Sequence, residues 1–435
     1  MQIIGILGIV LSLLAIIYFS VKGLNTLIGA PLAGLIVIIA NQMDILPSLV
    51  GSSGSYIASL ANFVIANFAI FLLGSLLAKY MDKSGATISI SDKILNIVGT
   101  DKPYSVLLAL FIIASLLTLG GISMFVVCFA IIPMARPLFK KLNLSWNLVT
   151  VPVFAGMATF TLSMFPGTPA MSNVIPSTSL GTTLTAAPFV GIVTSVIVIV
   201  YSLFYMNYAL KKSISNGETY QEKDVEQSNA NDRKLPSFIV SIIPVIALIS
   251  IIILFSKVSN IVVIALVISI LLSAFLFREY IPNQIGIINE GALASLPTTL
   301  TTGSTVAFGS LLTSAPAFMI IKDAILNLPG NPLISLSLAT VLLSAITGSS
   351  VGSVGIAMES FAQSYIAMGV NPEMIHRIAA IAAGTFGIMP HTGLVITFNT
   401  IAGLNLKQSY KYQFMTVNVG HMIALVVALI MSMVL

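Results

Sequence analysis

The stretch Phe165-Pro166-Gly167-Thr168-Pro169, followed by Ser172-Asn173-Val174-Ile175-Pro176-Ser177, lies in the middle of residues 142–210, which contain no Asp, Glu, Lys or Arg. A single helix of that length would extend roughly 100 Å, about three times the thickness of a bilayer core. Proline removes a helix hydrogen-bond donor and clashes with the preceding turn, so this stretch predicts a break. We therefore predict an unwound helix over residues 149–182 and a continuous helix over residues 184–210.

The composition of the whole chain places this break inside a membrane. Of the 435 residues, 57% are hydrophobic and only 8% are charged, whereas an average soluble domain is about 25% charged. These values exclude a soluble enzyme, a disordered chain and a disulfide-rich secreted protein. The net charge of +5 is not a sign of nucleic-acid binding, because basic residues in membrane proteins mainly set orientation. The fold class predicted is an all-α polytopic membrane protein.

A second charge-free run, residues 103–135, predicts a hairpin. It has the sequence Thr118-Leu119-Gly120-Gly121-Ile122-Ser123 at its centre and basic residues on both flanks. The positive-inside rule places both flanks in the cytoplasm, and the run is short for two full crossings. A re-entrant hairpin with its tip at Gly120-Gly121 satisfies both conditions, because non-helical backbone is tolerated at membrane depth where it is buried in protein.

The second half of the chain repeats this order of features. Residues 324–358 break at Thr347-Gly348-Ser349-Ser350-Val351-Gly352-Ser353 and predict a second hairpin. Residues 378–406 break at Met389-Pro390-His391-Thr392-Gly393 and predict a second broken helix.

Two structural repeats follow from this order. We predict a first repeat over residues 1–210, a solvated cytoplasmic linker over 211–236 and a second repeat over 237–435, each repeat with about five spans and one hairpin. An odd number of spans inverts the second repeat relative to the first. With the N-terminus outside, 16 of the 19 Lys and Arg residues fall on the inner side, as the positive-inside rule requires. The three outer ones are Lys257, Lys322 and Arg377.

Inverted repeats with discontinuous helices are typical of secondary transporters, whose site lies near the bilayer midplane. The N-termini of half-helices offer unpaired N–H groups and a positive dipole end, which favour an anion. The breaks are rich in Gly, Ser, Thr and Asn, which suit a small hydroxylated carboxylate. The substrate-binding candidates are Gly120, Gly121, Ser123, Gly167, Thr168, Asn173, Thr347, Gly348, Ser349, Ser350, Thr392 and Asn399.

Ionisable groups within a membrane are candidates for ion coupling. His391 lies in the second break, and its unperturbed pKa near 6.5 suits proton exchange. Glu359, which follows the second hairpin tip, is a further candidate, although it also fits the outer interface. His376 and His421 are interpreted as structural or interfacial, and the scattered histidines give no support to a metal site. No cofactor is expected.

The residues of the first break resemble the gluconate:proton symporter family. The resemblance rests on Phe165–Pro169, Asn173–Pro176 and Leu180–Thr183, on Gly121–Val127, and on Pro390–Gly393, and it covers nearly the whole chain. It implies proton-coupled uptake of a sugar acid or small hydroxy-carboxylate across a bacterial cytoplasmic (inner) membrane. It further implies a homodimer and a transport domain that moves as an elevator.

Other functions stay open at the level of sequence. Sodium coupling is the close alternative, because unwound backbone carbonyls also hold Na⁺. A channel and an intramembrane enzyme are more distant, since the sequence has no H-E-x-x-H motif and no G-x-S-x-G elbow with an acid partner. The chain is therefore predicted to be a transporter of a small anion and a proton rather than an enzyme.

Overall fold

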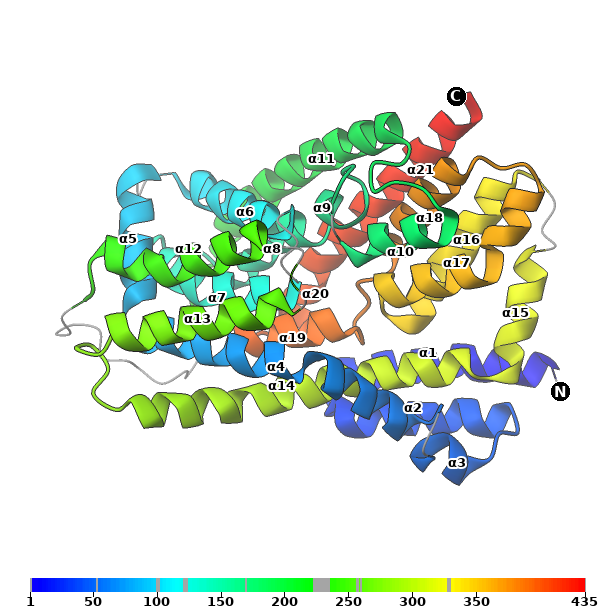
Figure 1. Ribbon diagram of the computed structural model, residues 1–435, viewed down its shortest axis with the longest axis horizontal. Helices are drawn as coiled ribbons and strands as arrows, with labels where there is room; N and C mark the ends of the chain where they lie inside the picture. Colours follow the sequence, from blue (N-terminus) through cyan, green and yellow to red (C-terminus); the bar gives the residue numbers. More distant parts are fainter. Residues whose placement is uncertain are drawn as a thin grey trace.

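The computed structural model describes residues 2–51, 54–98, 102–119, 124–168, 170–221, 235–255, 258, 260–326 and 330–434. These residues form helices and connecting loops, with no strand among them, as predicted (Figure 1). Within this part of the chain, five helices are long and apolar enough to cross a membrane: Ile3–Ser20, Tyr56–Lys83, Trp146–Ser163, Pro188–Ser215 and Leu406–Val434. The prediction of a polytopic α-helical membrane protein is confirmed at this level.

The first half of the chain contains both long helices and a series of short segments. Its elements are α1 (Gln2–Val21), α2 (Thr26–Ala40), α3 (Ile45–Val50), α4 (Tyr56–Lys83), α5 (Ala86–Val98), α6 (Pro103–Leu119), α7 (Met124–Lys141), η1 (Trp146–Val149), α8 (Thr150–Met157), α9 (Phe160–Ser163), α10 (Met171–Leu180) and α11 (Pro188–Ser215).

The second half has a closely similar order of long and short helices. Its elements are α12 (Phe238–Leu254), α13 (Ile261–Leu276), α14 (Gln284–Thr313), α15 (Pro316–Leu326), α16 (Pro332–Thr347), α17 (Ser350–Ala367), α18 (Pro372–Thr385), α19 (Gly393–Ala402), α20 (Leu406–Gln413), the π-helix η2 (Phe414–Asn418) and α21 (Val419–Val434). The ten-residue helices α10 and α19 occupy matching places in the two halves, and each ends at a left-handed glycine, Gly181 and Gly403.

Helix contacts also come in matching pairs. Helix α1 packs on α2 as α12 packs on α13, α4 packs on α13 as α14 packs on α2, and α6 packs on α8 as α16 packs on α18. In Figure 1, the short helices α5 and α15 stand across opposite ends of the molecule, each after one of the long helices α4 and α14.

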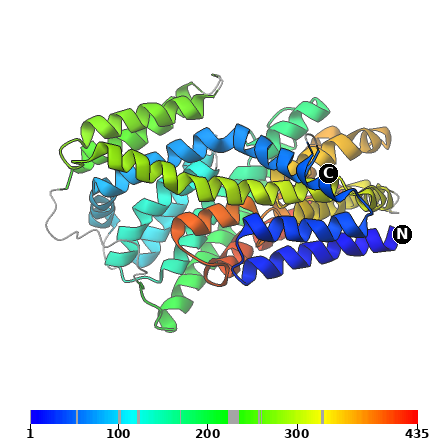
Figure 2. The same ribbon diagram turned by 90° about the horizontal axis from the view of Figure 1, so that it is seen from below.

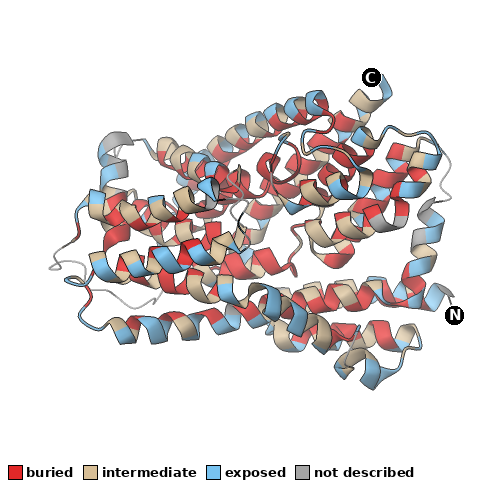
Figure 3. Ribbon diagram, viewed as in Figure 1, coloured by how far each residue is buried: buried red, intermediate tan, exposed pale blue. Residues whose placement is uncertain are grey.

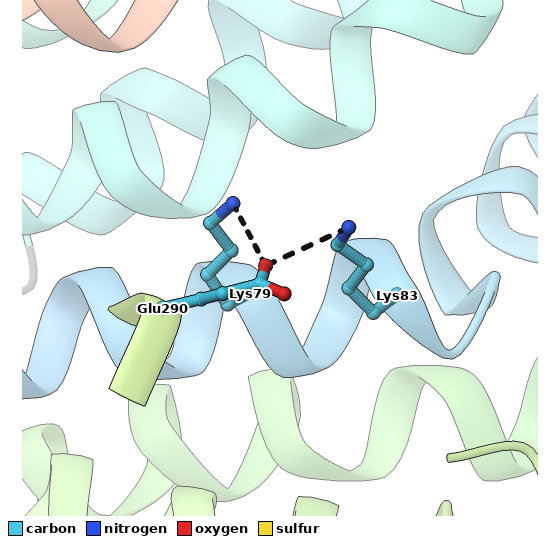
Figure 4. A network of polar contacts seen from close by, with 3 residues as sticks. All are labelled: Lys79, Lys83 and Glu290. Carbon is cyan, nitrogen blue, oxygen red and sulfur yellow. Dashed lines mark hydrogen bonds and ion pairs between the residues drawn. The ribbon is translucent and has the colours of Figure 1, made fainter. Parts of the chain in front are cut away.

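Helices α4 and α14 lie side by side and antiparallel (Figures 1 and 2). Near the start of α4, the Tyr56 hydroxyl lies 2.5 Å from the Ser304 hydroxyl. At its end, Glu290 lies 3.4 Å from Lys79 and 3.6 Å from Lys83 (Figure 4). These charged groups are partly exposed, so the pairs set register more than they add stability.

Burial separates an interior from an apolar outer surface (Figure 3). Between Trp146 and Ser163, 94% of residues are buried, against 28% between Ile3 and Ser20, so the segment with the first break lies in the centre of the protein. On α11, an exposed apolar stripe recurs at helical spacing and is suited to lipid. It consists of Phe189, Ile192, Val196, Val200 and Phe204.

Two predicted boundaries differ from the structure. The second broken helix begins at Pro372, before the predicted residue 378, and the second arm of the second hairpin continues to Ala367, beyond residue 358. Both differences have one cause: the predicted limits were set at charged residues, yet helices α17 and α18 include Glu359, Glu373 and Arg377.

Candidate functional site

The connection between α16 and α17 consists of two residues, Gly348 and Ser349. Helix α16 ends where Gly348 adopts a left-handed conformation (φ +60°), which glycine tolerates best. Helix α17 begins immediately, because the Ser349 hydroxyl accepts a hydrogen bond of 3.1 Å from the Gly352 N–H. The Thr347 hydroxyl donates to the Leu343 carbonyl at 2.8 Å. The candidates Thr347 to Ser350 therefore form one tight turn between two helices that pack against each other.

This turn contacts the second break, residues 386–392. A Cβ atom placed on Gly348 would lie 3.1 Å from Thr392 Cγ2 and 3.2 Å from His391 Nε2. Ser350 is in close contact with Gly387 at the start of the break. The structure thus brings together the candidates from the second hairpin and those from the second broken helix.

His391 and Thr392 are buried but lack hydrogen-bond partners. Their exposed fractions are 1% and 0%, and neither ring nitrogen of His391 nor Oγ1 of Thr392 is hydrogen bonded. Helix α19 follows directly, and Thr392 does not cap it with its side chain. Buried polar groups are almost always paired, so an unpaired cluster beside a helix N-terminus is a site suited to a ligand.

The first break runs from Ala158 to Ala170 and includes the single turn α9. Gly167 has φ +87° and donates its N–H to the Leu184 carbonyl at 3.0 Å. The Thr168 hydroxyl is buried and unpaired, and α10 begins three residues later, at Met171, without a side-chain cap. This repeats the arrangement of the second break, with an unpaired threonine hydroxyl before an uncapped ten-residue helix.

Asn173 is fully buried, and its amide is occupied by protein partners. Its Nδ2 donates to the carbonyls of Thr168 and Leu184, both at 2.9 Å. Its Oδ1 lies 2.8 Å from Nε2 of His376. Because an amide oxygen only accepts, His376 Nε2 donates, and His376 Nδ1 is left to accept from the Thr182 hydroxyl at 2.7 Å. Asn173 therefore ties the first break to α18.

One face of α18 holds the loop between α10 and α11. Glu373 accepts from the N–H of Ala187 at 3.0 Å, and Ala187 has a left-handed backbone (φ +42°). Arg377 donates to the Ala186 carbonyl through Nε at 3.1 Å and through Nη2 at 2.8 Å, and to the Ser163 carbonyl through Nη1 at 3.0 Å. The first break and this loop thus contact the N-terminal half of α18, whereas the second break follows its C-terminal end.

The placement of Arg377 corrects the sequence analysis. The positive-inside count treats Arg377 as an outer flanking residue, but its side chain is completely buried, as is that of His376. Its hydrogen-bond partners are carbonyl dipoles, which stabilise a guanidinium but leave its charge in place. A buried cation of this kind attracts an anion strongly, because the local dielectric is low.

His421, on the last helix, lies between the two broken helices. Its Nε2 is 3.0 Å from the Ser163 hydroxyl of the first broken helix. Its ring also lies so close to Gly384 of the second that an added Cβ would overlap it. Sequence reasoning missed this position, because His421 stands alone in an apolar run without a proline or glycine break.

The tight contact at Gly384 gives a first prediction. Gly384→Ala is expected to displace His421 and to lower the free energy of unfolding by about 1–3 kcal/mol. Gly355→Ala, at another helical glycine with no atom within 4 Å of the added Cβ, is the matched control and should be close to neutral. Thermal unfolding can be followed with a thiol-reactive dye, because the single cysteine, Cys128, is fully buried. Equal melting temperatures for the two variants would contradict the contact.

The remaining candidates are distributed as follows. Asn399, on α19, lies 3.4 Å from Gln413 Nε2 through its Oδ1. Gly120, Gly121 and Ser123 lie outside the described residues, and Glu359 is in α17 with a side chain outside the described set. Among the described residues, no group of three His, Cys, Asp or Glu side chains could hold a metal ion.

A cavity of about 310 Å³ opens beside the C-terminal end of α19, near the end of α11. Its wall includes Arg136, which donates to the Ala402 carbonyl at 2.9 Å and lies 5.0 Å from the centre of the Trp146 ring. This cavity is next to Gly403, whereas the corresponding loop after Gly181 is held against α18 by Glu373 and Arg377.

Comparison with known proteins gives a consistent result over the full chain. Residues 1–434 match the sequence profile described as GntP family permease. The chain is 28% identical over 447 residues to the "Uncharacterized transporter YxjC" of Bacillus subtilis (strain 168), and the match covers 93% of each protein.

Proposed function

Because the chain belongs to the GntP family of permeases, a family of multi-pass membrane transporters, we propose that it takes up a small hydroxy-carboxylate or sugar acid together with a proton. The observation that carries the proposal is the set of buried, unpaired polar groups at the two breaks: Thr168, His391 and Thr392. A solute that enters there is surrounded by donors rather than by carboxylates.

The charge of the solute follows from the site. The uncapped N-termini of α10 and α19 offer free N–H groups and the positive ends of helix dipoles. Arg377 adds a positive charge whose hydrogen-bond partners are carbonyls, and Glu373, one helical turn before it on α18, interacts with it electrostatically. Hydroxyl groups at Thr168 and Thr392 both donate and accept, as the hydroxyls of a sugar acid do. These features together favour a hydroxylated monocarboxylate over a cation or an apolar solute.

The proposed mechanism is an elevator built on inverted repeats. The matched helix contacts, the antiparallel α4–α14 pair and the two left-handed glycines after α10 and α19 support the repeats. We place the two hairpins, α6–α7 and α16–α17, as re-entrant segments and residues 211–236 as the cytoplasmic linker. Substrate candidates are Gly120, Gly121, Ser123, Gly167, Thr168, Asn173, Thr347 to Ser350, Thr392 and Asn399.

The assembly and its membrane are part of the same proposal. We place the protein in the bacterial cytoplasmic membrane as a homodimer, because an elevator needs a fixed scaffold against which the transport domain moves. Cross-linking in native membranes, followed by gel analysis, tests the dimer: a ladder that stops at two subunits supports it, and a monomer alone contradicts it.

Purified protein in liposomes tests the function with radiolabelled D-gluconate. An inside-alkaline pH difference of one unit is expected to support about tenfold accumulation, since one pH unit corresponds to a factor of ten in proton activity. One proton per monoanion makes the cycle electroneutral, so a membrane potential alone should have little effect. Accumulation that survives collapse of the proton gradient and follows a Na⁺ gradient would instead support sodium coupling.

Candidates for the coupling group on sequence grounds are His391 and Glu359. Both ring nitrogens of His391 are unpaired, so either one is available to a substrate that enters the second break.

A further inference from the structure

We propose that His421 on the last helix, rather than His391 in the second break, takes up the co-transported proton; this inference rests on the proposed function and names the group that couples it. The geometry around His421 supplies what proton coupling needs: a defined acceptor atom, a partner that can switch roles and contact with both broken helices.

The tautomer of His421 follows from its partners. Its Nδ1 lies 2.9 Å from the Val417 carbonyl, and a carbonyl only accepts, so Nδ1 carries the hydrogen. In the neutral ring, Nε2 is therefore an acceptor, and it receives the hydrogen of the Ser163 hydroxyl at 3.0 Å. A serine hydroxyl has both a donor and lone pairs, so it can rotate and accept when Nε2 binds a proton. Protonation of His421 therefore keeps the hydrogen bond of this pair and reverses its direction.

The other two histidines are less suited to this role. His391 has no hydrogen-bond partner on either nitrogen, so no described group would hold an added proton on its ring. His376 donates to Asn173 through one nitrogen and accepts from Thr182 through the other. Thr182, like Ser163, could turn to accept, but His376 is adjacent to Arg377 in the chain, so a second proton on its ring would lie beside a fixed positive charge.

Ser163 links Arg377 to His421. Nη1 of Arg377 donates to the Ser163 carbonyl, and the hydroxyl of the same residue contacts His421. A carboxylate bound beside Ser163 would therefore lie near both groups, and its negative charge favours a second proton on His421. His421 thus takes a proton from solution when the carboxylate arrives and releases it when the carboxylate leaves.

The other titratable groups on elements that pack against α21 are as follows. Helix α18 carries Glu373, which accepts from the Ala187 N–H and interacts electrostatically with Arg377, and His376. Helix α11 carries Tyr201, whose hydroxyl donates to the Met415 carbonyl. The remaining titratable residues of α11 are Tyr205, Tyr208, Lys211 and Lys212. The described elements α9, α16 and η2 contain no titratable residue.

A second observation points to a ligand at the same place. Asn418, three residues before His421 and on the same face of the helix, is fully buried, and neither atom of its amide has a partner. An amide needs a donor and an acceptor, and a hydroxyl group supplies both. Asn418 ends the π-helix η2, a geometry that is frequent at functional sites. We assign Asn418 to a hydroxyl of the substrate beside the protonated His421.

His421→Gln tests the inference, because glutamine can still accept from Ser163 but cannot take a proton. In liposomes, this variant is expected to lose at least about tenfold in accumulation driven by the pH difference, while counterflow of D-gluconate continues. His391→Gln, in the proposed substrate site, is expected to transport more slowly but to keep the wild-type ratio of uptake with and without the pH difference. Accumulation by His421→Gln with the wild-type pH dependence would overturn the inference, as would loss of counterflow in a folded variant. If the wild type itself ignores the pH difference, the proposed function fails instead.

A measurement on the wild type covers the case in which His421→Gln does not fold. The chain has three histidines, so ¹⁵N-histidine NMR in nanodiscs gives three sets of ring signals. His421 is expected as the Nδ1–H tautomer, and saturating D-gluconate should raise its titration midpoint by about one pH unit or more, a tenfold gain in proton affinity. A midpoint that D-gluconate leaves unchanged, in protein that transports it, would overturn the inference.

Discussion

Arg377→Met is expected to abolish uptake of D-gluconate and to lower the free energy of unfolding by about 3–5 kcal/mol, the range for loss of one partner from a buried charged network. The substitution leaves the carbonyls of Ser163, Leu184 and Ala186 without their donor. It also removes the buried positive charge that, in the proposed function, attracts the anion.

Two further variants separate the charge from the hydrogen bonds. Arg377→Lys keeps the charge, but a lysine side chain lacks the planar fork that reaches three carbonyls. We therefore expect this variant to lose nearly as much stability as Arg377→Met but to retain part of the substrate affinity. Arg278→Met, at an exposed arginine beside Phe275, controls for the loss of one positive charge and should transport normally. The dye that reacts with Cys128 reports stability, and thermal protection by D-gluconate reports binding. Transport at the wild-type rate by Arg377→Met would contradict a role for this charge.

The sequence was informative where the backbone itself is unusual. Proline and glycine mark both breaks and the turn at Gly348, because these residues change what the backbone can do whatever surrounds them. The loops before α10 and α19 contain Phe165 to Thr168 and Met389 to Thr392, where breaks were predicted. The predicted break over Ser172–Ser177 is wrong, because these residues are helical in α10, which includes Pro176. The low charge content sufficed to predict a helical membrane protein.

The sequence misled where a charge is buried. Charged residues were used to mark the ends of spans, and this is valid only while each charge lies at a membrane surface. Arg377 violates the assumption, since carbonyls of two distant segments solvate it in place of water. Those partners lie some 190 to 215 residues earlier in the chain, so the sequence around Arg377 does not predict them. The start of α18 and the cluster of Glu373, His376 and Arg377 could therefore be found only in the structure.

The position of His421 has the same explanation. Its neighbours Ser163 and Gly384 come from both halves of the chain, and a single histidine in an apolar helix has no spacing pattern. The predicted site contained Asn173, whose amide is fully hydrogen bonded to protein partners. It did not contain His376, which is one of those partners. Residues that act by contact between distant parts of the chain need the tertiary structure before they can be recognised.

Gly348→Ala is expected to reduce transport of D-gluconate by at least about tenfold while it lowers the free energy of unfolding by only about 1–2 kcal/mol. Stability is lost because a residue with a Cβ atom is strained in the left-handed conformation, which Gly348 adopts with φ +60°. The loss of transport comes from the new methyl group, which would lie 3.1 Å from Thr392 Cγ2 and 3.2 Å from His391 Nε2.

Gly369→Ala is the matched control for this experiment. Gly369 is also left-handed (φ +80°), but an added Cβ meets no atom within 4 Å, so the backbone penalty is similar and the site is untouched. The ratio of the two uptake rates, at equal amounts of folded protein, therefore isolates the contact between the hairpin tip and the second break. Equal rates would mean that this contact has no part in transport, and the unpaired His391 and Thr392 would then need another explanation. A large ratio, together with loss of thermal protection by D-gluconate in Gly348→Ala alone, would locate the substrate between the turn and the break, because the atoms nearest to the added methyl group belong to Thr392 and His391.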